Sequence, residues 1–215
     1  MKIQTSRSSK RGFSLIELIG VLAIIGILAG VIVPKVIQAT ARSKVTSTAA
    51  SYNSLKTAVA DYFGKNGNFP LRDGTGATNG PVATGRFDAD LVAGSFSEKL
   101  FSCAVGSQLY DASVLTGRTH VRTQTAAGNG TVTITASSGG NNFDLDGNTS
   151  TTDLSTANTV VSLVIPGVSV TDAVELNKLI DNETVSGAAA DLTGRCIFST
   201  PSSGTTTVYL YVAHN

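Results

Sequence analysis

The sequence predicts an α+β fold in which one long N-terminal helix packs on an antiparallel β-sheet. Two patterns predict this arrangement. Before residue 64 the apolar residues are first continuous and then recur every three or four positions, as in a helix, whereas after residue 118 they alternate with polar residues, as in strands. With 215 residues and 41% hydrophobic content, the chain has enough material for one ordinary domain plus an extension.

The predicted helix has two halves with different surfaces. Residues 18–33 carry no charge, and together with residues 13–17 they form a stretch of 21 residues, long enough to cross a membrane as a helix. We therefore assign residues 13–34 to a hydrophobic transmembrane and assembly helix. Residues 35–64 are its expected amphipathic continuation, ending at Gly64 as the C-cap. The apolar stripe of this second half consists of Val45, Thr48, Tyr52, Leu55, Val59 and Tyr62.

Residues 65–215 are expected to form an exposed α+β domain that is rich in Gly, Ser and Thr. Its predicted elements follow local helix or strand spacing and are bounded by turn residues. They are a short helix at Ser97–Phe101, a hairpin of Thr119–Thr125 with Thr131–Ser137, a buried strand at Thr159–Ile165, a helix at Asp172–Asp181 capped by Asp172 and Glu175, and a C-terminal hairpin of Gly194–Ser199 with Thr206–Ala213. Residues 137–158 are expected to be a long exposed loop.

Charge is distributed unevenly along the chain. Residues 1–12 contain four Lys or Arg residues and no acid, directly before the apolar stretch. Positive residues hold the near side of an inserted helix in the cytoplasm, so this end is expected to stay inside and the domain to lie outside. Residues 51–215 contain nine Lys or Arg and fourteen Asp or Glu residues, a net charge of −5. An acidic domain argues against binding of nucleic acid.

The junction between the basic end and the apolar stretch has the sequence Lys10-Arg11-Gly12-Phe13-Ser14-Leu15-Ile16-Glu17. This segment resembles the processing site of type IV prepilins and of the pseudopilins of type II secretion. The resemblance implies a leader at residues 1–12, cleavage between Gly12 and Phe13 by a membrane prepilin peptidase, and methylation of the new amine of Phe13. A glycine before the cut suits this chemistry because it lets the backbone enter a protease site extended. For the fold, the resemblance implies a pilin-like ladle.

Glu17 is the one charged residue within residues 13–34. A carboxylate in such a segment is costly in lipid and normally has a partner and a function. The resemblance implies an assembly role, in which Glu17 forms a salt bridge with the methylated amine of Phe13 in a neighbouring subunit. The alternative is a glutamate that reaches the membrane interface from an ordinary anchor helix.

Three further residues of the apolar stretch are candidates for assembly. Gly26 and Gly30 are four residues apart, a spacing that lets two helices approach closely. Pro34 lacks a backbone donor and weakens the preceding helical turn. The resemblance implies that filament subunits lose helix locally between Gly26 and Pro34. The alternative is that Gly and Pro are simply common in membrane helices.

For function, the resemblance implies a structural subunit of a type IV pilus-like filament. Such a subunit waits in the inner membrane as a single-pass protein and is then assembled into a periplasmic or cell-surface filament. Its partners would be other copies and other pilin-like subunits, the prepilin peptidase, an assembly platform and its ATPase. One alternative is a pseudopilin of a type II secretion system. Another is a membrane-anchored or secreted binding module, including one exported by a conventional signal cleaved at Ala39-Thr40-Ala41.

The sequence predicts no enzymatic activity. Its two histidines, His120 and His214, lack a metal-ligand spacing, and no phosphate loop or nucleophile elbow is present. No cofactor is expected to be required. Asp144, Asp146 and Asn148 nevertheless place oxygen side chains at alternate positions, a pattern that suits Ca²⁺. The alternative for these residues is a solvated Asp-Gly turn.

Cys103 and Cys196 both fall in the region expected outside the cytoplasm. Two cysteines in an oxidising compartment generally pair, so a disulfide is predicted between them. It would enclose 92 residues, whereas the pilins that this chain resembles staple a compact C-terminal loop. Two reduced, buried thiols are the alternative.

Overall fold

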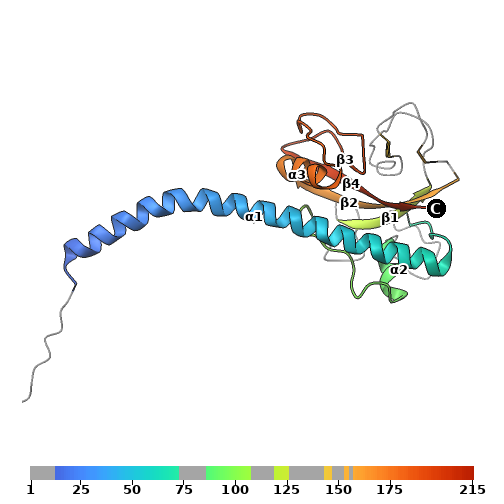
Figure 1. Ribbon diagram of the computed structural model, residues 1–215, viewed down its shortest axis with the longest axis horizontal. Helices are drawn as coiled ribbons and strands as arrows, with labels where there is room; N and C mark the ends of the chain where they lie inside the picture. Colours follow the sequence, from blue (N-terminus) through green and yellow to red (C-terminus); the bar gives the residue numbers. More distant parts are fainter. Residues whose placement is uncertain (1–12, 73–85, 108–118, 126–142, 147–152, 155–156) are drawn as a thin grey trace, which may run out of the picture. The chain divides into compact units, whose positions relative to one another are not determined.

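The computed structural model of the chain describes residues 13–72, 86–107, 119–125, 143–146, 153–154 and 157–215. It confirms the predicted α+β class, with a long N-terminal helix and an antiparallel sheet (Figure 1). The elements are α1 (Leu15–Asn66), α2 (Phe87–Ala93), β1 (His120–Thr125), β2 (Thr159–Ser169), α3 (Val170–Ile180), β3 (Cys196–Phe198) and β4 (Thr205–His214). The chain divides into two compact units, Met1–Thr40 and Ala41–Asn215.

In the first unit, α1 is apolar on every side. Its large apolar side chains up to Ile37 are all more than half exposed, so nothing within this unit covers them. An 18-residue window of α1 has a mean hydropathy of 2.8, which makes the helix long and apolar enough to cross a membrane by length and composition. The helix is continuous through Pro34, where one backbone donor is missing.

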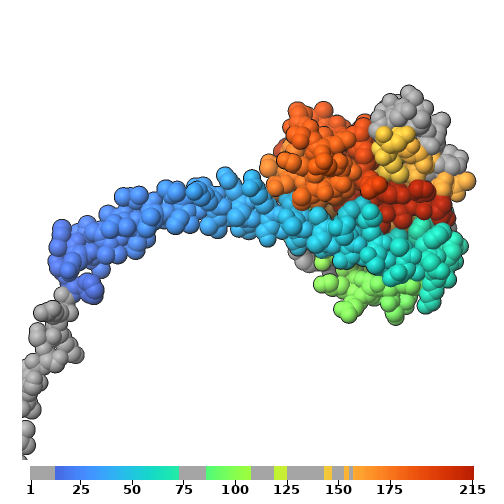
Figure 2. Space-filling view, viewed as in Figure 1, coloured from blue at the N-terminus to red at the C-terminus, as the bar shows by residue number. Residues whose placement is uncertain are grey.

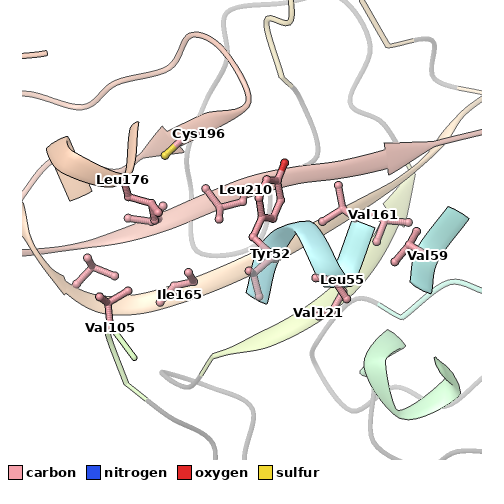
Figure 3. Close-up of a cluster of buried hydrophobic side chains, with 14 of the residues drawn as sticks. Tyr52, Leu55, Val59, Val105, Val121, Val161, Ile165, Leu176, Cys196 and Leu210 are labelled. Carbon is pink, nitrogen blue, oxygen red and sulfur yellow. The ribbon is translucent and has the colours of Figure 1, made fainter. Parts of the chain in front are cut away.

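In the second unit, α1 is buried on one side only. The buried residues of α1 are Val45, Thr48, Tyr52, Leu55 and Val59, which confirms the predicted stripe. Tyr62, the last residue of that stripe, is half-buried and packs edge-on against Phe87 with 5.0 Å between ring centroids. Figure 3 shows Tyr52, Leu55 and Val59 facing side chains of the sheet. The hydrophobic period of the helix therefore places it on the sheet.

The four strands are antiparallel in the order β1-β2-β4-β3. Alternate residues of β2 point to opposite faces, and both faces are covered. Val161, Leu163 and Ile165 join the cluster that contains the α1 stripe, together with Leu176 of α3. The space-filling view shows α3 and the following residues beside the amphipathic half of α1 (Figure 2), and Arg42 of α1 forms an exposed ion pair with Glu175 of α3 at 3.7 Å.

The other face of β2 carries a second cluster of buried hydrophobic side chains, which the sequence pattern did not predict. Val160 and Val164 pack there with Phe143, Leu154 and Tyr209. Phe143 and Leu154 are each only 1% exposed, so the prediction that residues 137–158 form an exposed loop was wrong at these positions. The two apolar side chains are isolated in a polar segment, and only the fold brings them onto the sheet.

Several predicted boundaries also differ from the structure. Residues 97–101 are not helical, and the short helix is α2, whose Phe87 and Leu91 lie four residues apart and are fully buried. Helix α1 continues to Asn66, and Gly67 follows it with a φ of 72°, so Gly64 is not the C-cap.

Among the remaining elements the predicted hairpin is present, whereas the predicted helix cap is not. The N-cap of α3 is Ser169, which accepts a hydrogen bond from the Asp172 backbone N–H at 3.2 Å, so the predicted Asp172–Glu175 cap was wrong. Strand β1 and the β3–β4 hairpin are confirmed. In the described residues β1 pairs with β2, and the predicted partner strand Thr131–Ser137 lies outside them.

Two buried ion pairs join α2 to the flanking chain. Arg72 donates from Nε and Nη2 to the carboxylate of Asp90 at 2.8 and 3.0 Å, and Arg86 makes the same two-point contact with Asp88. Asp88 also accepts from the backbone N–H of Phe101 at 2.9 Å. These side chains are at most 8% exposed. Removing one partner of such a pair strands a buried charge, so the pairs specify where α2 lies.

The turn before β3 depends on a carboxylate that binds backbone donors. Asp181 accepts hydrogen bonds from the backbone N–H groups of Arg195 and Cys196, at 3.0 and 2.7 Å. Gly194 precedes them with a φ of 81°, and a Cβ at this position would lie 2.6 Å from Asp181 Oδ2. Gly204, in the β3–β4 turn, has a similar φ of 79° but open space around it.

This pair of glycines provides a matched test. Gly204→Ala should cost about 1 kcal/mol, because only the left-handed backbone is strained. Gly194→Ala should cost about 2–4 kcal/mol, because the added methyl group also displaces the Asp181 carboxylate from its donors. Thermal melting of the purified chain in detergent measures both changes. Equal melting temperatures for the two variants would contradict this account of Asp181.

Candidate functional site

Glu17, the predicted assembly residue, lies in the first turn of α1. Glu17 accepts a hydrogen bond from the backbone N–H of Ser14 through Oε2 at 2.8 Å. The Ser14 carbonyl oxygen in turn accepts from the backbone N–H of Leu18 at 3.2 Å. The first N–H groups of a helix have no partner within the helix and carry positive partial charge, so a carboxylate is favoured there. The carboxylate therefore lies beside the backbone immediately after Phe13.

The predicted processing junction lies just before this turn. Phe13 and Ser14 precede the helix, which begins at Leu15, and Phe13 is 91% exposed. Gly12, the other residue of the junction, lies outside the described residues. An amine formed at Phe13 would stand one residue from the Ser14 N–H that Glu17 already binds. A cation and an anion would then share one end of a helix that is otherwise apolar.

The other candidate assembly residues face open space in the single chain. A Cβ built at Gly26 or Gly30 would meet no atom within 4 Å, so the helix surface there is free for the approach of another helix. The implied local loss of helix does not occur in the chain alone, because α1 is continuous from Leu15 to Asn66 with Pro34 inside it.

The two cysteines are thiols in the structure, so the predicted disulfide is not confirmed. Cys103 is half-buried, and its Sγ donates to the Val105 carbonyl oxygen at 3.1 Å. Cys196 is fully buried in β3, and burial raises the pKa of its thiol, with Asp181 and Asp191 adding to the effect. A buried thiol with a raised pKa reacts slowly, as expected for a packing residue.

Three carboxylates come together where the sequence predicted a calcium site. One oxygen from each of Asp144, Asp146 and Asp153 lies within 4.8 Å of the others. Asp144 and Asp146 were predicted and Asp153 completes the group, whereas Asn148 lies outside the described residues. Three carboxylates at this separation repel one another, and a hard cation with oxygen ligands would relieve that repulsion.

Backbone contacts explain part of this arrangement without a metal. Asp153 accepts hydrogen bonds from the backbone N–H groups of Leu145 and Asp146, the latter at 3.1 Å. The Asp144 carbonyl oxygen accepts from the Gly194 N–H at 2.8 Å. The group is therefore attached to the turn before β3, and Asp153 holds it in place as well as contributing charge.

Calcium should raise the melting temperature of the chain if these carboxylates bind it. At a concentration one hundred times the dissociation constant, a ligand adds about 2.7 kcal/mol of stability. Asp146→Asn should abolish the response, because Asp146 is exposed and its replacement costs the fold little. Glu98→Gln, which replaces another exposed acid, is the control and should keep the response. Identical melting temperatures in calcium and in chelator would contradict calcium binding, and Asp153 would then have only its structural role.

The histidines do not add a catalytic or metal centre to the described part of the chain. His120 is buried in β1, and His214 is exposed near the C-terminus. His214 Nδ1 lies 2.5 Å from the Tyr211 hydroxyl oxygen, in hydrogen-bond contact. Neither belongs to a described group of side chains that could hold a metal ion.

Known proteins are similar to part of this chain. A family described as "Prokaryotic N-terminal methylation motif" matches residues 7–33. The chain is 41% identical over 63 residues to the type IV major pilin protein PilA of Myxococcus xanthus, covering 29% of each chain. It is 48% identical over 50 residues to a fimbrial protein of Pseudomonas aeruginosa, covering 23% of this chain and 32% of that protein. With the type IV major pilin protein PilE of Neisseria gonorrhoeae it shares 41% identity over 68 residues, 32% of this chain and 40% of that protein.

The similarity is confined to a fraction of each protein. The chain spans about a third of the length of the curated relatives it matches, and no solved structure matches it. The matched motif lies within the first unit, whereas the matches to the three relatives, over 50 to 68 residues, are longer than that unit and include part of the second.

Proposed function

We propose that this chain, whose N-terminal segment matches the methylation motif and which is similar in part to type IV pilins, is a structural subunit of a type IV pilus-like filament and not an enzyme. One observation carries the proposal. The first unit exposes a helix that is apolar on every side and has a single carboxylate, Glu17, next to the junction where processing would create an amine. Such a helix needs lipid or other helices around it.

Processing is the first step of the proposed function. A prepilin peptidase in the inner membrane would cut between Gly12 and Phe13, and the new amine of Phe13 would be methylated. The non-helical backbone at Phe13 and Ser14 supports this step, because a protease binds its substrate extended. The four basic residues before the cut support a cytoplasmic position for the leader.

Assembly is the second step. Copies anchored in the inner membrane would move into a filament in which their apolar helices pack together, with an ATPase and a platform protein driving the transfer. Gly26 and Gly30 would allow close approach, and the Phe13 amine of one copy would pair with Glu17 of the next. Burial of the pair among apolar helices selects one register, since every other register leaves both charges without a partner.

Two alternatives remain as tests of the proposal. A pseudopilin of a type II secretion system would share the processing chemistry, and electron microscopy of cell surfaces separates it by filament length. The names of the relatives, pilins and fimbrial proteins, favour the pilus. A membrane-anchored or secreted binding module would lack processing at Phe13, so the intact mass of the mature protein distinguishes it.

Glu17 should be needed for assembly and not for folding of the second unit. Glu17→Ala leaves an uncompensated cation among packed helices, which typically costs about 3–5 kcal/mol at each contact. Filaments sheared from cells should be nearly lost, while the protein stays in the membrane fraction.

Glu17→Gln separates charge from capping, because an amide oxygen can still accept from the Ser14 N–H. We expect this variant to assemble as poorly as Glu17→Ala. Normal filaments from Glu17→Ala would contradict the assembly mechanism, and filaments restored by Glu17→Gln would assign the effect to capping alone.

Gly12→Glu should block processing and accumulate the uncut precursor. A side chain at this position restricts the backbone conformations available at the cut and adds a charge at the membrane surface. Intact-mass analysis should find a mature chain that begins with methylated Phe13 in the wild type, and the full-length chain in the variant. A mature N-terminus at Arg42 would instead indicate conventional signal cleavage.

A further inference from the structure

A small polar pocket lies between α1 and the C-terminal end of α3. Its volume is about 150 Å³, large enough for one carboxylate group with a few water molecules. Lys56 and Asn53 line it from α1, and Arg195 lines it from the segment before β3. Leu179 and Ile180 of α3 form its apolar side. Two cations and an amide donor therefore face one cavity.

Neither cation forms an ion pair in the part of the chain that the structure describes. Lys56 Nζ lies 5.5 Å from the ring centroid of Tyr52, and the hydroxyl of that tyrosine donates to the Tyr211 carbonyl oxygen. The Tyr52 hydroxyl is thus already bonded, and its ring helps to hold the lysine at the pocket.

Asp181, which lies close to Arg195, already binds backbone donors. Asp181 lies within electrostatic range of Arg195, and burial raises the pKa of the Asp181 carboxyl group. Its oxygens accept hydrogen bonds from the backbone N–H groups of Arg195 and Cys196, not from the arginine side chain. Arg195 is exposed and lines the pocket, and its guanidinium group offers five N–H donors.

We infer that this pocket binds a carboxylate side chain from a second copy of the chain, so that Lys56 and Arg195 form an ion-paired contact between subunits. The inference rests on the proposed filament function. Charge complementarity selects the occupant, because residues 51–215 have a net charge of −5 while the pocket presents two positive groups. Neighbouring copies in a filament bring such acids close at high effective concentration.

The described chain offers exposed acids for this contact. Asp61, Glu98 and Glu183 are exposed, and none of them forms an ion pair with another described residue of its own copy. An arginine fork and a lysine on one carboxylate make charge-assisted hydrogen bonds, which are stronger and more directional than a surface pair. The contact would therefore orient the folded domains in addition to the packing of the apolar helices.

Carbodiimide cross-linking of sheared filaments tests the inference directly. This reagent joins an amine to a carboxylate only where the two are in contact. In wild-type filaments, digestion and mass spectrometry should therefore find a peptide of one copy linked through Lys56 to a peptide of another, distinct from any link between the Phe13 amine and Glu17. Lys56→Arg keeps the charge but removes the reactive amine, so its filaments should form normally and give less covalent dimer. Lys178→Arg is the matched control, because Lys178 is exposed on α3 and does not line the pocket, and it should keep the Lys56-linked peptide.

A charge-reversed variant tests the role in assembly. Lys56→Glu combined with Arg195→Glu should lower the yield of sheared filaments about tenfold or more, whereas Lys178→Glu should not. Intact mass should still show the processed chain, and a cooperative melting transition in detergent should show that the variant is folded.

Wild-type cells without filaments would contradict the proposed function and this inference together. Wild-type filaments in which no peptide is linked through Lys56, or normal filament yield from the charge-reversed variant, would overturn only the inference.

Discussion

The contact between the α1 stripe and the inner face of the sheet is the interaction on which the folded unit depends. One buried cluster contains residues from all seven helices and strands. Tyr52 belongs to this cluster and is 3% exposed, with its ring drawn near Leu210 (Figure 3) and its hydroxyl bonded to the backbone of β4. Without α1, the inner faces of β2 and β4 would be open to water. The helix therefore completes the core of this unit.

The same helix leaves its first half with no core to join. In residues 13–37 the hydrophobic effect favours burial, and the first unit provides nothing to bury against. A helix that is apolar on every side is stable only in lipid or among similar helices. Both steps proposed for the subunit meet this requirement, because transfer from the membrane to a filament exchanges one apolar environment for another. Apolar burial alone does not discriminate between registers, so specificity has to come from polar groups such as Glu17.

Sequence patterns predicted those parts of the fold that local spacing determines. The α1 stripe followed from the helical period, and β1 and the β3–β4 hairpin followed from alternation. The position of α2 could not be predicted in this way, because it depends on pairing of Asp88 and Asp90 with arginines that precede the helix. Phe143 and Leu154 were missed since single apolar residues in a polar segment carry no period. At the candidate site, the spacing of Asp144 and Asp146 was visible in the sequence, whereas the contribution of Asp153 required backbone hydrogen bonds.

Polar groups thus divide into two kinds in this chain. The Arg72–Asp90 and Arg86–Asp88 pairs are satisfied within one copy and specify its fold. Glu17, Lys56 and Arg195 form no ion pair within the described part of their own copy. A solvated surface charge needs no partner, but Glu17 lies in an apolar helix and the two cations converge on one pocket. Because these groups belong to different units of the chain, one contact would set the register of the helices and the other the orientation of the folded domains.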